Sequence, residues 1–178
     1  EAWGLDVSTH AIEQVREDVR GYCRVASLAA PLTERYDLIV CNEVIEHLPA
    51  ADAERAIANL CGASDDVLFS STPDGYAEDT HLNVRPVEYW TELFAKHGFA
   101  RDVDYDCSTF LAPWARRFRK THDPWHRTAA SYERRLWATS REVAELRRRG
   151  LETAAVMARQ DAALRERADL QRLEQTVA

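Results

Sequence analysis

Apolar runs and helical repeats alternate along the chain up to about residue 120. The run Leu38–Cys41 is apolar at every residue, which is typical of a strand covered on both faces of a sheet. The pattern predicts five more strands, at residues 3–7, 23–25, 67–71, 99–105 and 108–112.

Three helices are expected between these strands. The first has apolar residues at helical spacing from Ala11 to Val19, and Gly21 ends it. The second opens at Pro49 and Asp52 and ends near Gly62, with its apolar side formed by Ala53, Ala56, Ile57 and Leu60. The third starts at Pro86 and runs to Gly98, and its Tyr89 and Trp90 are assigned to core and lid packing. Alternating strands and helices predict an α/β, Rossmann-like fold with a mainly parallel sheet and right-handed crossovers.

The character of the sequence changes from Trp125 onward, where Arg, Glu, Ala and Leu dominate. Two heptad frames, displaced by one position, hold the apolar residues: Leu136, Val143, Leu146, Met157 and Leu164 in one, and Val156, Leu170, Leu173 and Val177 in the other. This pattern predicts a long helix, either an imperfect coiled coil or a helical hairpin. We therefore expect two domains, 1–120 and 121–178, and self-association through residues 125–178.

Charge and cysteine content narrow the classes of function. The net charge is −7, and residues 1–120 carry 21 acidic and 12 basic side chains, which argues against general binding to nucleic acid or anionic membranes. The four cysteines are scattered without a Cys-x-x-Cys pair, as expected for reduced thiols in a cytoplasmic protein. No apolar run approaches the ~20 residues that span a membrane. The basic stretch Ala112–Lys120 is interpreted as a solvated helix edge or an interdomain contact.

Polar side chains follow the apolar strand at its carboxyl end, where open α/β sheets place their ligands. Glu43, Glu46 and His47 would occupy positions i, i+3 and i+4 of a helix and could converge. Asp6 ends the first strand, and its carboxylate could accept two hydrogen bonds from one ligand. Alternatively, Asp6 caps the helix that begins near Ser8.

The segment Tyr36–Leu48 combines a buried strand, a change to polar residues at its end and the sequence Glu-Val-Ile-Glu-His-Leu. In this it resembles the fourth strand and following segment of class I S-adenosylmethionine-dependent methyltransferases. The resemblance covers residues 1–120 and implies the strand order 3-2-1-4-5-7-6, of which strand 1 and its glycine-rich loop are not found. Because the chain begins with Glu1 and the pattern starts in mid-domain, we expect a part of a longer domain that is inactive by itself.

The resemblance implies S-adenosylmethionine as cofactor. Asp6 would hold its ribose, Ser27 and Leu28 would lie near its adenine, and Cys41, Asn42 and Glu43 would line the remaining cofactor pocket. The loop at Ser27 lacks the acidic residue that the family commonly places there. This interpretation requires Asp6 and the turn after Val40 to lie side by side at one edge of a shared sheet.

Two similar subfamilies, the small-RNA terminal ribose 2′-O-methyltransferases and the ubiquinone-pathway O-methyltransferases, hold a divalent ion with Glu-x-x-Glu-His. By that resemblance Glu43, Glu46, His47 and His81 could bind Mg, Mn or Zn. The alternative is that Glu43 and His47 line the cofactor pocket without metal, while Glu46 caps a helix or forms a salt bridge locally. His47 could also act as general base, because an imidazole takes up a proton readily at neutral pH, or be structural.

The loop from Asp74 to Arg85 resembles methyltransferase modules of bacterial proteins that also carry glycosyltransferase domains. His81, Asn83 and Arg85 would then face the acceptor, and the alternative is a polar surface loop. The implied activity is methyl transfer to a hydroxyl of a glycan or another small molecule, with a fused glycosyltransferase as a possible partner. Two other functions stay open: a degenerate fold that serves as a scaffold through its coiled coil, and metal-assisted methylation of RNA ribose.

Overall fold

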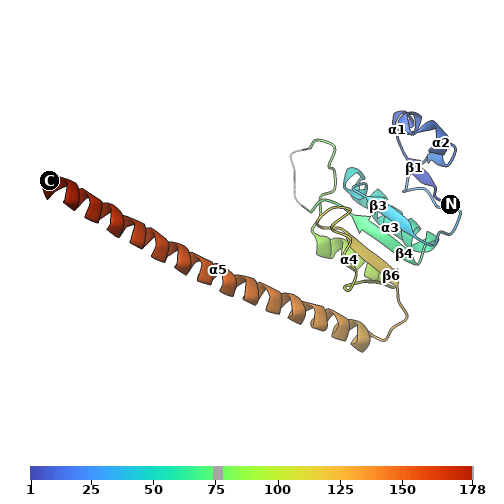
Figure 1. The fold of residues 1–178 in the computed structure, drawn as a ribbon. Helices are drawn as coiled ribbons and strands as arrows, with labels where there is room; N and C mark the ends of the chain where they lie inside the picture. Colours follow the sequence, from blue (N-terminus) through green and yellow to red (C-terminus); the bar gives the residue numbers. More distant parts are fainter. Residues whose placement is uncertain (74–77, 178) are drawn as a thin grey trace. The chain divides into compact units, whose positions relative to one another are not determined.

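The computed structural model describes residues 1–73 and 78–177, with side chains described in 1–73 and 78–165. It contains two compact units, Glu1–Thr128 and Ala129–Ala178 (Figure 1). Each unit is described by itself below. Asp74 and Gly75, at the start of the loop that the sequence assigns to the acceptor, lie outside the described residues.

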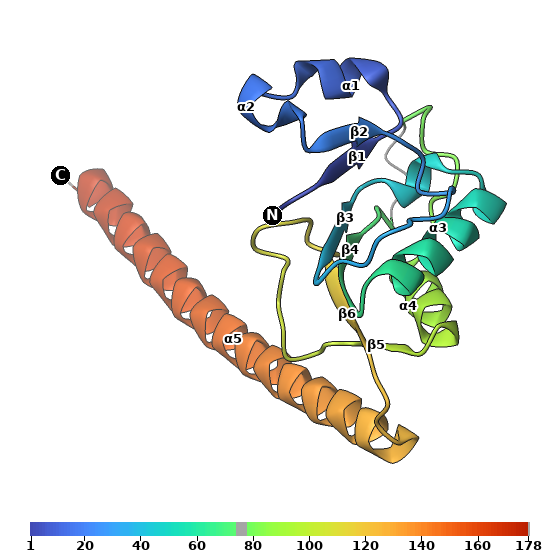
Figure 2. The same ribbon diagram turned by 90° about the vertical axis from the view of Figure 1, so that its right-hand side faces the viewer.

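The first unit contains two sheets (Figure 2). Strands β1 (Gly4–Asp6) and β2 (Cys23–Val25) form a parallel pair. The second sheet has the order β3-β4-β6-β5 and comprises β3 (Ile39–Asn42), β4 (Asp66–Ser70), β5 (Phe99–Arg101) and β6 (Arg116–Lys120). Strand β3 pairs parallel to β4, whereas β6 runs antiparallel to both of its neighbours. The α/β, Rossmann-like fold is therefore confirmed.

The order of the strands agrees with the family order as far as its strands are present, because β2-β1 corresponds to 3-2 and β3-β4-β6-β5 to 4-5-7-6. The prediction of one shared sheet is wrong. Asp6 ends a strand of the two-stranded sheet, and Asn42 ends a strand of the four-stranded sheet. The physical reason is that the described residues provide no strand that could pair with β1 and β3 at once.

Helices α3 (Ala50–Ala63) and α4 (Val87–Lys96) pack against one face of the four-stranded sheet. The apolar positions predicted for α3 are buried, including Ile57 and Leu60 with no exposed surface. In α4, Trp90, Leu93 and Phe94 are buried, and Val87 is half-buried. The rings of Phe94 and Phe118 stack with centroids 4.0 Å apart, and Phe69 meets both at their edges. This aromatic cluster joins α4 to β4 and β6.

The opposite face of the sheet is only partly covered. Leu68 of β4 packs with Cys107 and Ala115 of the segment between β5 and β6. By contrast, Leu38 just before β3 and Val40 within it are 47% and 54% exposed, while Ile39 and Cys41 pack on the α3 side. The prediction that Leu38–Cys41 is covered on both faces is therefore wrong for the described part of the chain.

The first predicted helix is broken into α1 (Thr9–Gln14) and α2 (Glu17–Arg20). Val15 and Arg16 have extended backbone, and the Arg20 guanidinium donates to the Val15 carbonyl oxygen at 2.8 Å. Neither helix buries a residue. Because short helices depend on tertiary packing for their stability, this segment has little to hold it in one straight helix.

The strand predicted at Ser108–Ala112 is wrong, because these residues form turns. The last strand, β6, lies instead in the basic stretch that the sequence assigns to a helix edge. Phe118 enters the core, and on the adjacent position Arg117 makes a two-pronged contact with Asp66 and a longer one with Asp102. Carboxylates of neighbouring segments thus neutralise the positive charge of Arg117 on an interior strand.

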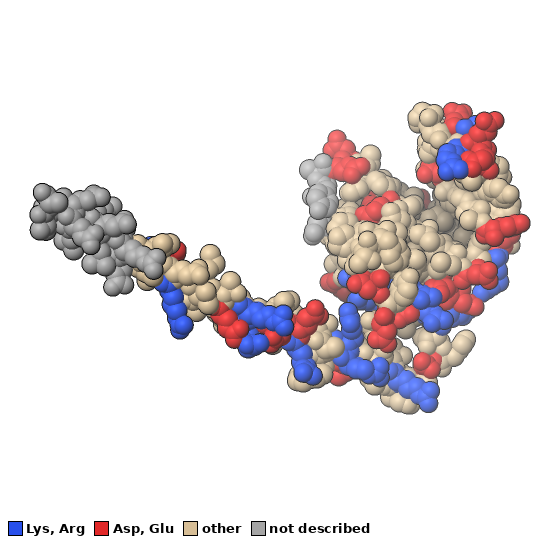
Figure 3. Space-filling view, viewed as in Figure 1, with Lys and Arg blue, Asp and Glu red and all other residues tan. Residues whose placement is uncertain are grey.

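Helix α5 has the bounds Trp125–Val177, and from Ala129 onward it forms the second unit. The predicted long helix is confirmed and the hairpin alternative is wrong. Basic and acidic side chains are interspersed along the part of α5 whose side chains are described (Figure 3), and Glu145 pairs with both Arg148 and Arg149. The apolar residues of the first heptad frame are exposed, whereas Leu170, Leu173 and Val177 lie outside the described side chains. None of the described helices is long and apolar enough to cross a membrane.

The packing of the aromatic cluster predicts which substitutions destabilise the fold. Replacing Phe118 by Ala removes a fully buried ring that stacks on Phe94, and such a cavity costs about 3–5 kcal/mol. The matched control is Phe110→Ala, because Phe110 is 56% exposed and exposed substitutions usually stay within about 0.5 kcal/mol. Urea unfolding of the full-length protein measures both. Equal unfolding midpoints for the two variants would contradict the assigned core.

Candidate functional site

The carboxyl ends of β3 and β4 are tied together by hydrogen bonds. The Glu43 amide donates to the carbonyl oxygen of Ser70 at 3.2 Å and to its hydroxyl at 3.1 Å. The Ser70 hydroxyl in turn donates to Asn42 Oδ1 at 3.0 Å. Glu43 turns the chain out of the strand with a φ of 51°, a left-handed conformation that is uncommon for a residue with a side chain. Such local strain is concentrated at functional sites.

The prediction that Glu43 shares a helical face with Glu46 and His47 is wrong. The helix here is η1 (Ile45–His47), a single 3₁₀ turn, and Glu43 lies before it. The Glu43 carboxylate accepts a hydrogen bond from Trp114 Nε1 at 2.9 Å. It nevertheless stays near the Glu46 carboxylate, whose titration it influences.

Glu46 has no exposed surface, and neither of its carboxylate oxygens has a hydrogen-bond partner within the described residues. Burial raises the pKa of Glu46, and the negative charge of Glu43 raises it further. The backbone carbonyl of Glu46 accepts from the amides of Leu82 and Asn83 at 2.8 and 2.9 Å, which holds the following loop over the carboxylate. Burying a carboxylate without a partner costs free energy. A bound proton or cation would therefore stabilise this side chain.

His47 and His81 meet edge to face, with ring centroids 4.8 Å apart. His47 Nδ1 lies 3.1 Å from the Thr80 carbonyl oxygen, which can only accept, so Nδ1 carries the proton and Nε2 a lone pair. His81 Nε2 contacts Glu78 at 3.2 Å, and its buried Nδ1 has no hydrogen-bond partner in the described part of the chain. One ligand atom from each of Glu46, His47 and His81 lies within 4.8 Å of the others.

These three residues make up three of the four metal ligands predicted from the sequence, and Glu43 is not among them. Two imidazole nitrogens with one carboxylate oxygen suit Zn, Mn or Fe, and they leave positions open for water or substrate. The unpartnered atoms of Glu46 and His81 are groups that a cation would satisfy. The residues present therefore fit a divalent ion.

Asn83 and Arg85 are held in local contacts. The Asn83 side chain is buried, and its Oδ1 accepts from Arg85 Nε at 2.9 Å. The Arg85 guanidinium lies over the ring of Tyr89 at 5.3 Å from its centroid. These contacts hold Asn83 and Arg85 to each other and Arg85 to Tyr89 of α4.

Asp6 is exposed, and its Oδ1 accepts from the Ser8 amide at 2.7 Å. Ser8, which caps α1, accepts from Ala11 in its turn. Asp6 therefore makes a local contact next to the start of α1, as the alternative interpretation expects. This contact uses only one of its two carboxylate oxygens. The Asp6 carbonyl oxygen also accepts from the Ala26 amide at 2.9 Å, which places the loop at Ser27 next to Asp6.

Ser27 and Leu28 sit in a loop fixed to α3. The Ser27 hydroxyl accepts from the Ala29 amide at 3.2 Å, and Asn59 donates to the Leu28 carbonyl oxygen at 2.7 Å. The Leu28 side chain is buried in the core. Of the predicted adenine contacts, the Ser27 hydroxyl thus already has a backbone partner.

Cys41 is buried, and burial raises the pKa of its thiol to about 12, with Glu46 and Glu43 adding to the shift. The thiol is thus uncharged at neutral pH. Its side chain packs in the core, so a cofactor contact at this position would use the backbone.

Two side chains at this site, Ser71 and Trp114, have no place in the sequence-based interpretation of the site. Ser71 follows β4 and lies near enough to Glu46 to influence its titration. Trp114 belongs to the stretch assigned to a basic helix edge, and no periodicity of the sequence distinguishes it. Its role becomes visible only when the segment before β6 is brought against the end of β3.

No known protein family matches this sequence. No curated protein matches it either.

Solved structures, by contrast, share the fold. The chain is similar to magnesium protoporphyrin IX methyltransferase from Synechocystis PCC 6803, solved with bound SAM, at 16% identity and a TM-score of 0.51 over 67% of this chain and 59% of that one. It also matches mitomycin 7-O-methyltransferase, at 15% identity and a TM-score of 0.46 over 66% and 40%. At this identity the first similarity shows the fold alone, and the second is too weak to carry an argument.

The chain therefore shares part of its Rossmann-like fold with the first of these proteins. It spans about three fifths of the length of the first of these proteins.

The raised pKa of Glu46 predicts how the stability of the protein depends on pH. A raised carboxyl pKa means that the folded protein holds the proton more tightly than the unfolded chain, in which a Glu titrates near 4.3. The associated stability is full below that pH and is lost as pH rises through the folded pKa. In chelator at pH 8, Glu46→Gln should therefore be more stable than wild type by about 1 kcal/mol, because the buried group stays neutral.

Urea unfolding of the full-length protein at pH 5 and pH 8 measures the effect, and the difference should shrink at the lower pH. Glu88→Gln, on the exposed face of α4, is the control and should match wild type at both. A Glu46→Gln protein that is less stable than wild type at pH 8 would show that the carboxylate is compensated.

Proposed function

We propose that the complete domain transfers the methyl group of S-adenosylmethionine to an oxygen atom of a small-molecule acceptor. One observation carries this proposal: polar residues follow β1, β2 and β3 at their carboxyl ends, in two sheets whose strands together have the methyltransferase order, with a reversed β6. Ligands of open α/β folds bind at this edge. The scaffold alternative requires only the fold, whereas methyl transfer also accounts for the buried polar groups at Glu46 and His81.

The proposal includes a further strand that lies between β1 and β3 in the complete domain. Its support is the free edge of β3, which pairs with β4 alone among the described strands, and the exposure of Val40 beside it. Such a strand would join the two sheets into one. The requirement that Asp6 and Asn42 lie at a shared edge would then be met.

In this arrangement Asp6 would accept hydrogen bonds from the ribose, and the backbone at Ser27 and Leu28 would contact the adenine. Asn42 and Glu43 would bound the same pocket from β3. The cofactor supplies the electrophilic methyl group. The methyl carbon would bond to the acceptor oxygen as its bond to the cofactor sulfur breaks, the sulfur keeping the electron pair. His47 Nε2, the nitrogen that carries the lone pair, would take up the hydroxyl proton.

Calorimetric titration of the full-length protein with S-adenosylmethionine tests the proposal. We expect saturable binding that Asp6→Ala weakens at least about tenfold, since a lost charge-assisted hydrogen bond is worth about 1.5–3 kcal/mol. Asp18→Ala, on exposed α2, is the matched control and should bind as wild type does. Absence of binding at millimolar cofactor would contradict the proposal and favour the scaffold.

We also propose that Glu46, His47 and His81 hold a divalent ion. The ion would polarise the acceptor hydroxyl as a Lewis acid. His47 Nε2 has one lone pair, so His47 is a ligand when the ion is bound and a base when it is not. A metal requirement would make RNA ribose methylation the second candidate, although the acidic excess of residues 1–120 disfavours a nucleic-acid partner.

Thermal unfolding with Mn²⁺ or Zn²⁺ tests the ion site. A bound ion should stabilise the chelator-treated protein by about 2.7 kcal/mol at a hundredfold excess over Kd, which His81→Ala should abolish. His97→Ala, an exposed residue at the end of α4, should keep the full stabilisation. If metal leaves the melting temperature of wild type unchanged, the three residues serve the metal-free mechanism.

The remaining partners are proposals of the same kind. The exposed heptad residues of α5, such as Leu136 and Leu164, support self-association as a coiled coil. A fused glycosyltransferase domain would supply a glycan acceptor to the same site. Four free cysteines, of which Cys41, Cys61 and Cys107 are buried, support a location in the reducing cytoplasm.

A further inference from the structure

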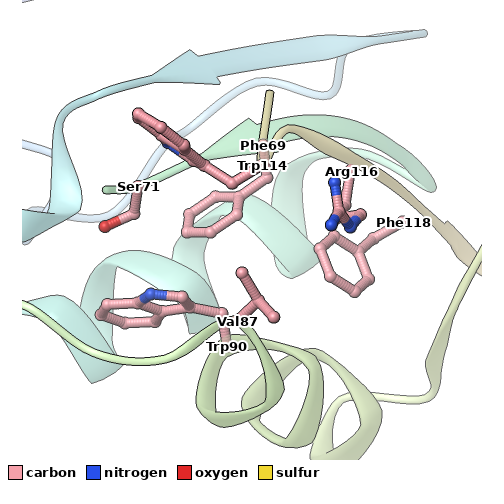
Figure 4. Close-up of a pocket in the computed structure, with 7 residues that line it drawn as sticks. All are labelled: Phe69, Ser71, Val87, Trp90, Trp114, Arg116 and Phe118. Carbon is pink, nitrogen blue, oxygen red and sulfur yellow. The ribbon is translucent and has the colours of Figure 1, made fainter. Parts of the chain in front are cut away.

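Buried polar atoms lack a partner within the described residues at two places near the end of β4. One is a cavity lined mostly by aromatic rings, among them the ring of Trp90 with its unpartnered Nε1 (Figure 4). This cavity has room for about one water molecule, and a water there would give Trp90 a partner. The other place is the candidate ion site, where both carboxylate oxygens of Glu46 and Nδ1 of His81 are unpartnered. Carboxylate oxygens and an imidazole nitrogen are ligands that suit a cation.

The ring of His81 is oriented by Glu78. Its Nε2 lies 3.2 Å from Glu78 Oε2, and the His81 amide donates to the Glu78 carbonyl oxygen at 3.0 Å. A carboxylate only accepts, so Nε2 carries the proton of the neutral ring and Nδ1 has the lone pair. Nδ1 is also the buried nitrogen of this ring, so it is the atom that His81 offers to an ion.

The same turn orients His47. The Thr80 carbonyl oxygen lies 3.1 Å from His47 Nδ1, which leaves Nε2 of that ring as the ligand atom. The Thr80 hydroxyl donates to Glu78 Oε1 at 2.9 Å and thereby fixes the carboxylate that contacts His81. Residues 78–81 thus hold both imidazoles with one lone pair of each left free.

We propose that Glu78 and Thr80 are positioning residues of the ion site. They hold His81 and His47 in the ring orientation and tautomer in which Nδ1 of the first and Nε2 of the second bind the ion together with Glu46. The inference rests on the ion site proposed above, and it adds two residues that do not touch the ion themselves.

The physical reason is that an imidazole binds a metal through one nitrogen and in one ring orientation. The group that accepts from the other ring nitrogen selects both, and a carboxylate acceptor also makes the ligand nitrogen more basic. The Glu78 side chain is 56% exposed, and exposed ion pairs contribute little to stability. Its contact with His81 is therefore expected to matter for ion binding and not for folding.

Titration of the full-length protein with Mn²⁺, with the free ion followed by electron paramagnetic resonance, tests the proposal. Glu78→Ala should weaken Mn²⁺ binding about 10–100-fold, while its urea unfolding midpoint in chelator should equal that of wild type. Asp79→Ala is the matched control, because it removes the same charge from an exposed position in the same turn. This control should bind Mn²⁺ within about twofold of wild type.

Two further variants separate orientation from charge. The side-chain oxygen of Gln still accepts a hydrogen bond, so Glu78→Gln should bind Mn²⁺ more tightly than Glu78→Ala. Thr80→Val keeps the carbonyl oxygen that His47 contacts and removes the hydroxyl that fixes Glu78. Its expected loss is about threefold, as for one hydrogen bond.

Equal Mn²⁺ binding by wild type and Glu78→Ala would overturn the positioning role and leave the ion site standing. Glu78→Gln as weak as Glu78→Ala, or an equal loss in Asp79→Ala, would show an effect of charge and overturn it too. If wild type binds no Mn²⁺ at millimolar concentration, the proposed ion site fails and this inference fails with it. A parallel titration of Glu78→Ala with S-adenosylmethionine tests methyl transfer separately, because Glu78 is not among the proposed cofactor contacts.

Discussion

The pairing of β3 is the constraint on which the rest of this structure depends. Among the described strands β3 pairs with β4 alone, and on its open face Leu38 and Val40 are exposed. Parallel strands of α/β proteins are normally buried on both faces and paired on both sides unless they form an edge. On the α3 side, by contrast, Ile39 and Cys41 join a complete core. The same boundary keeps β1–β2 as a separate sheet, although loops still connect the two through contacts such as Asn59 to Leu28.

The candidate site is divided between the same two sheets. One half of the site lies on the four-stranded sheet. There Ser70 and Glu43, whose backbone is left-handed, fix the end of β3. Glu46 lies buried next to the loop that carries His81. The other half, with Asp6 and the loop at Ser27, stands on the two-stranded sheet. The first half is built from the main core and holds the unpartnered buried groups. The second half rests on three-residue strands and short helices without buried residues. The proposed methyl transfer therefore requires the two sheets to be joined.

The sequence predicts those parts that a local period determines. Helices α3 and α4 follow directly from apolar residues at 3.6-residue spacing, and Glu46, His47 and His81 do come together as predicted. A four-residue apolar run cannot reveal whether both of its faces are covered, so the exposure of Val40 was not predictable. Strand β6 was missed because its basic residues are compensated by carboxylates distant in sequence, such as Asp66 and Asp102. The departure of Glu43 from the helix depends on a positive φ, and its contact with Trp114 spans 71 positions; neither leaves a local signal.

Amide hydrogen exchange of β3 tests the central claim most directly, namely that β1–β2 and β3–β4 are two parts of one sheet in the complete domain. It would be measured in the full-length protein and in the 178-residue chain described here. If a strand pairs with the free edge, the amides of β3 that point away from β4 should exchange slowly in the full-length protein and rapidly in the shorter chain. Equally rapid exchange in both would show that the edge stays open and would contradict the account.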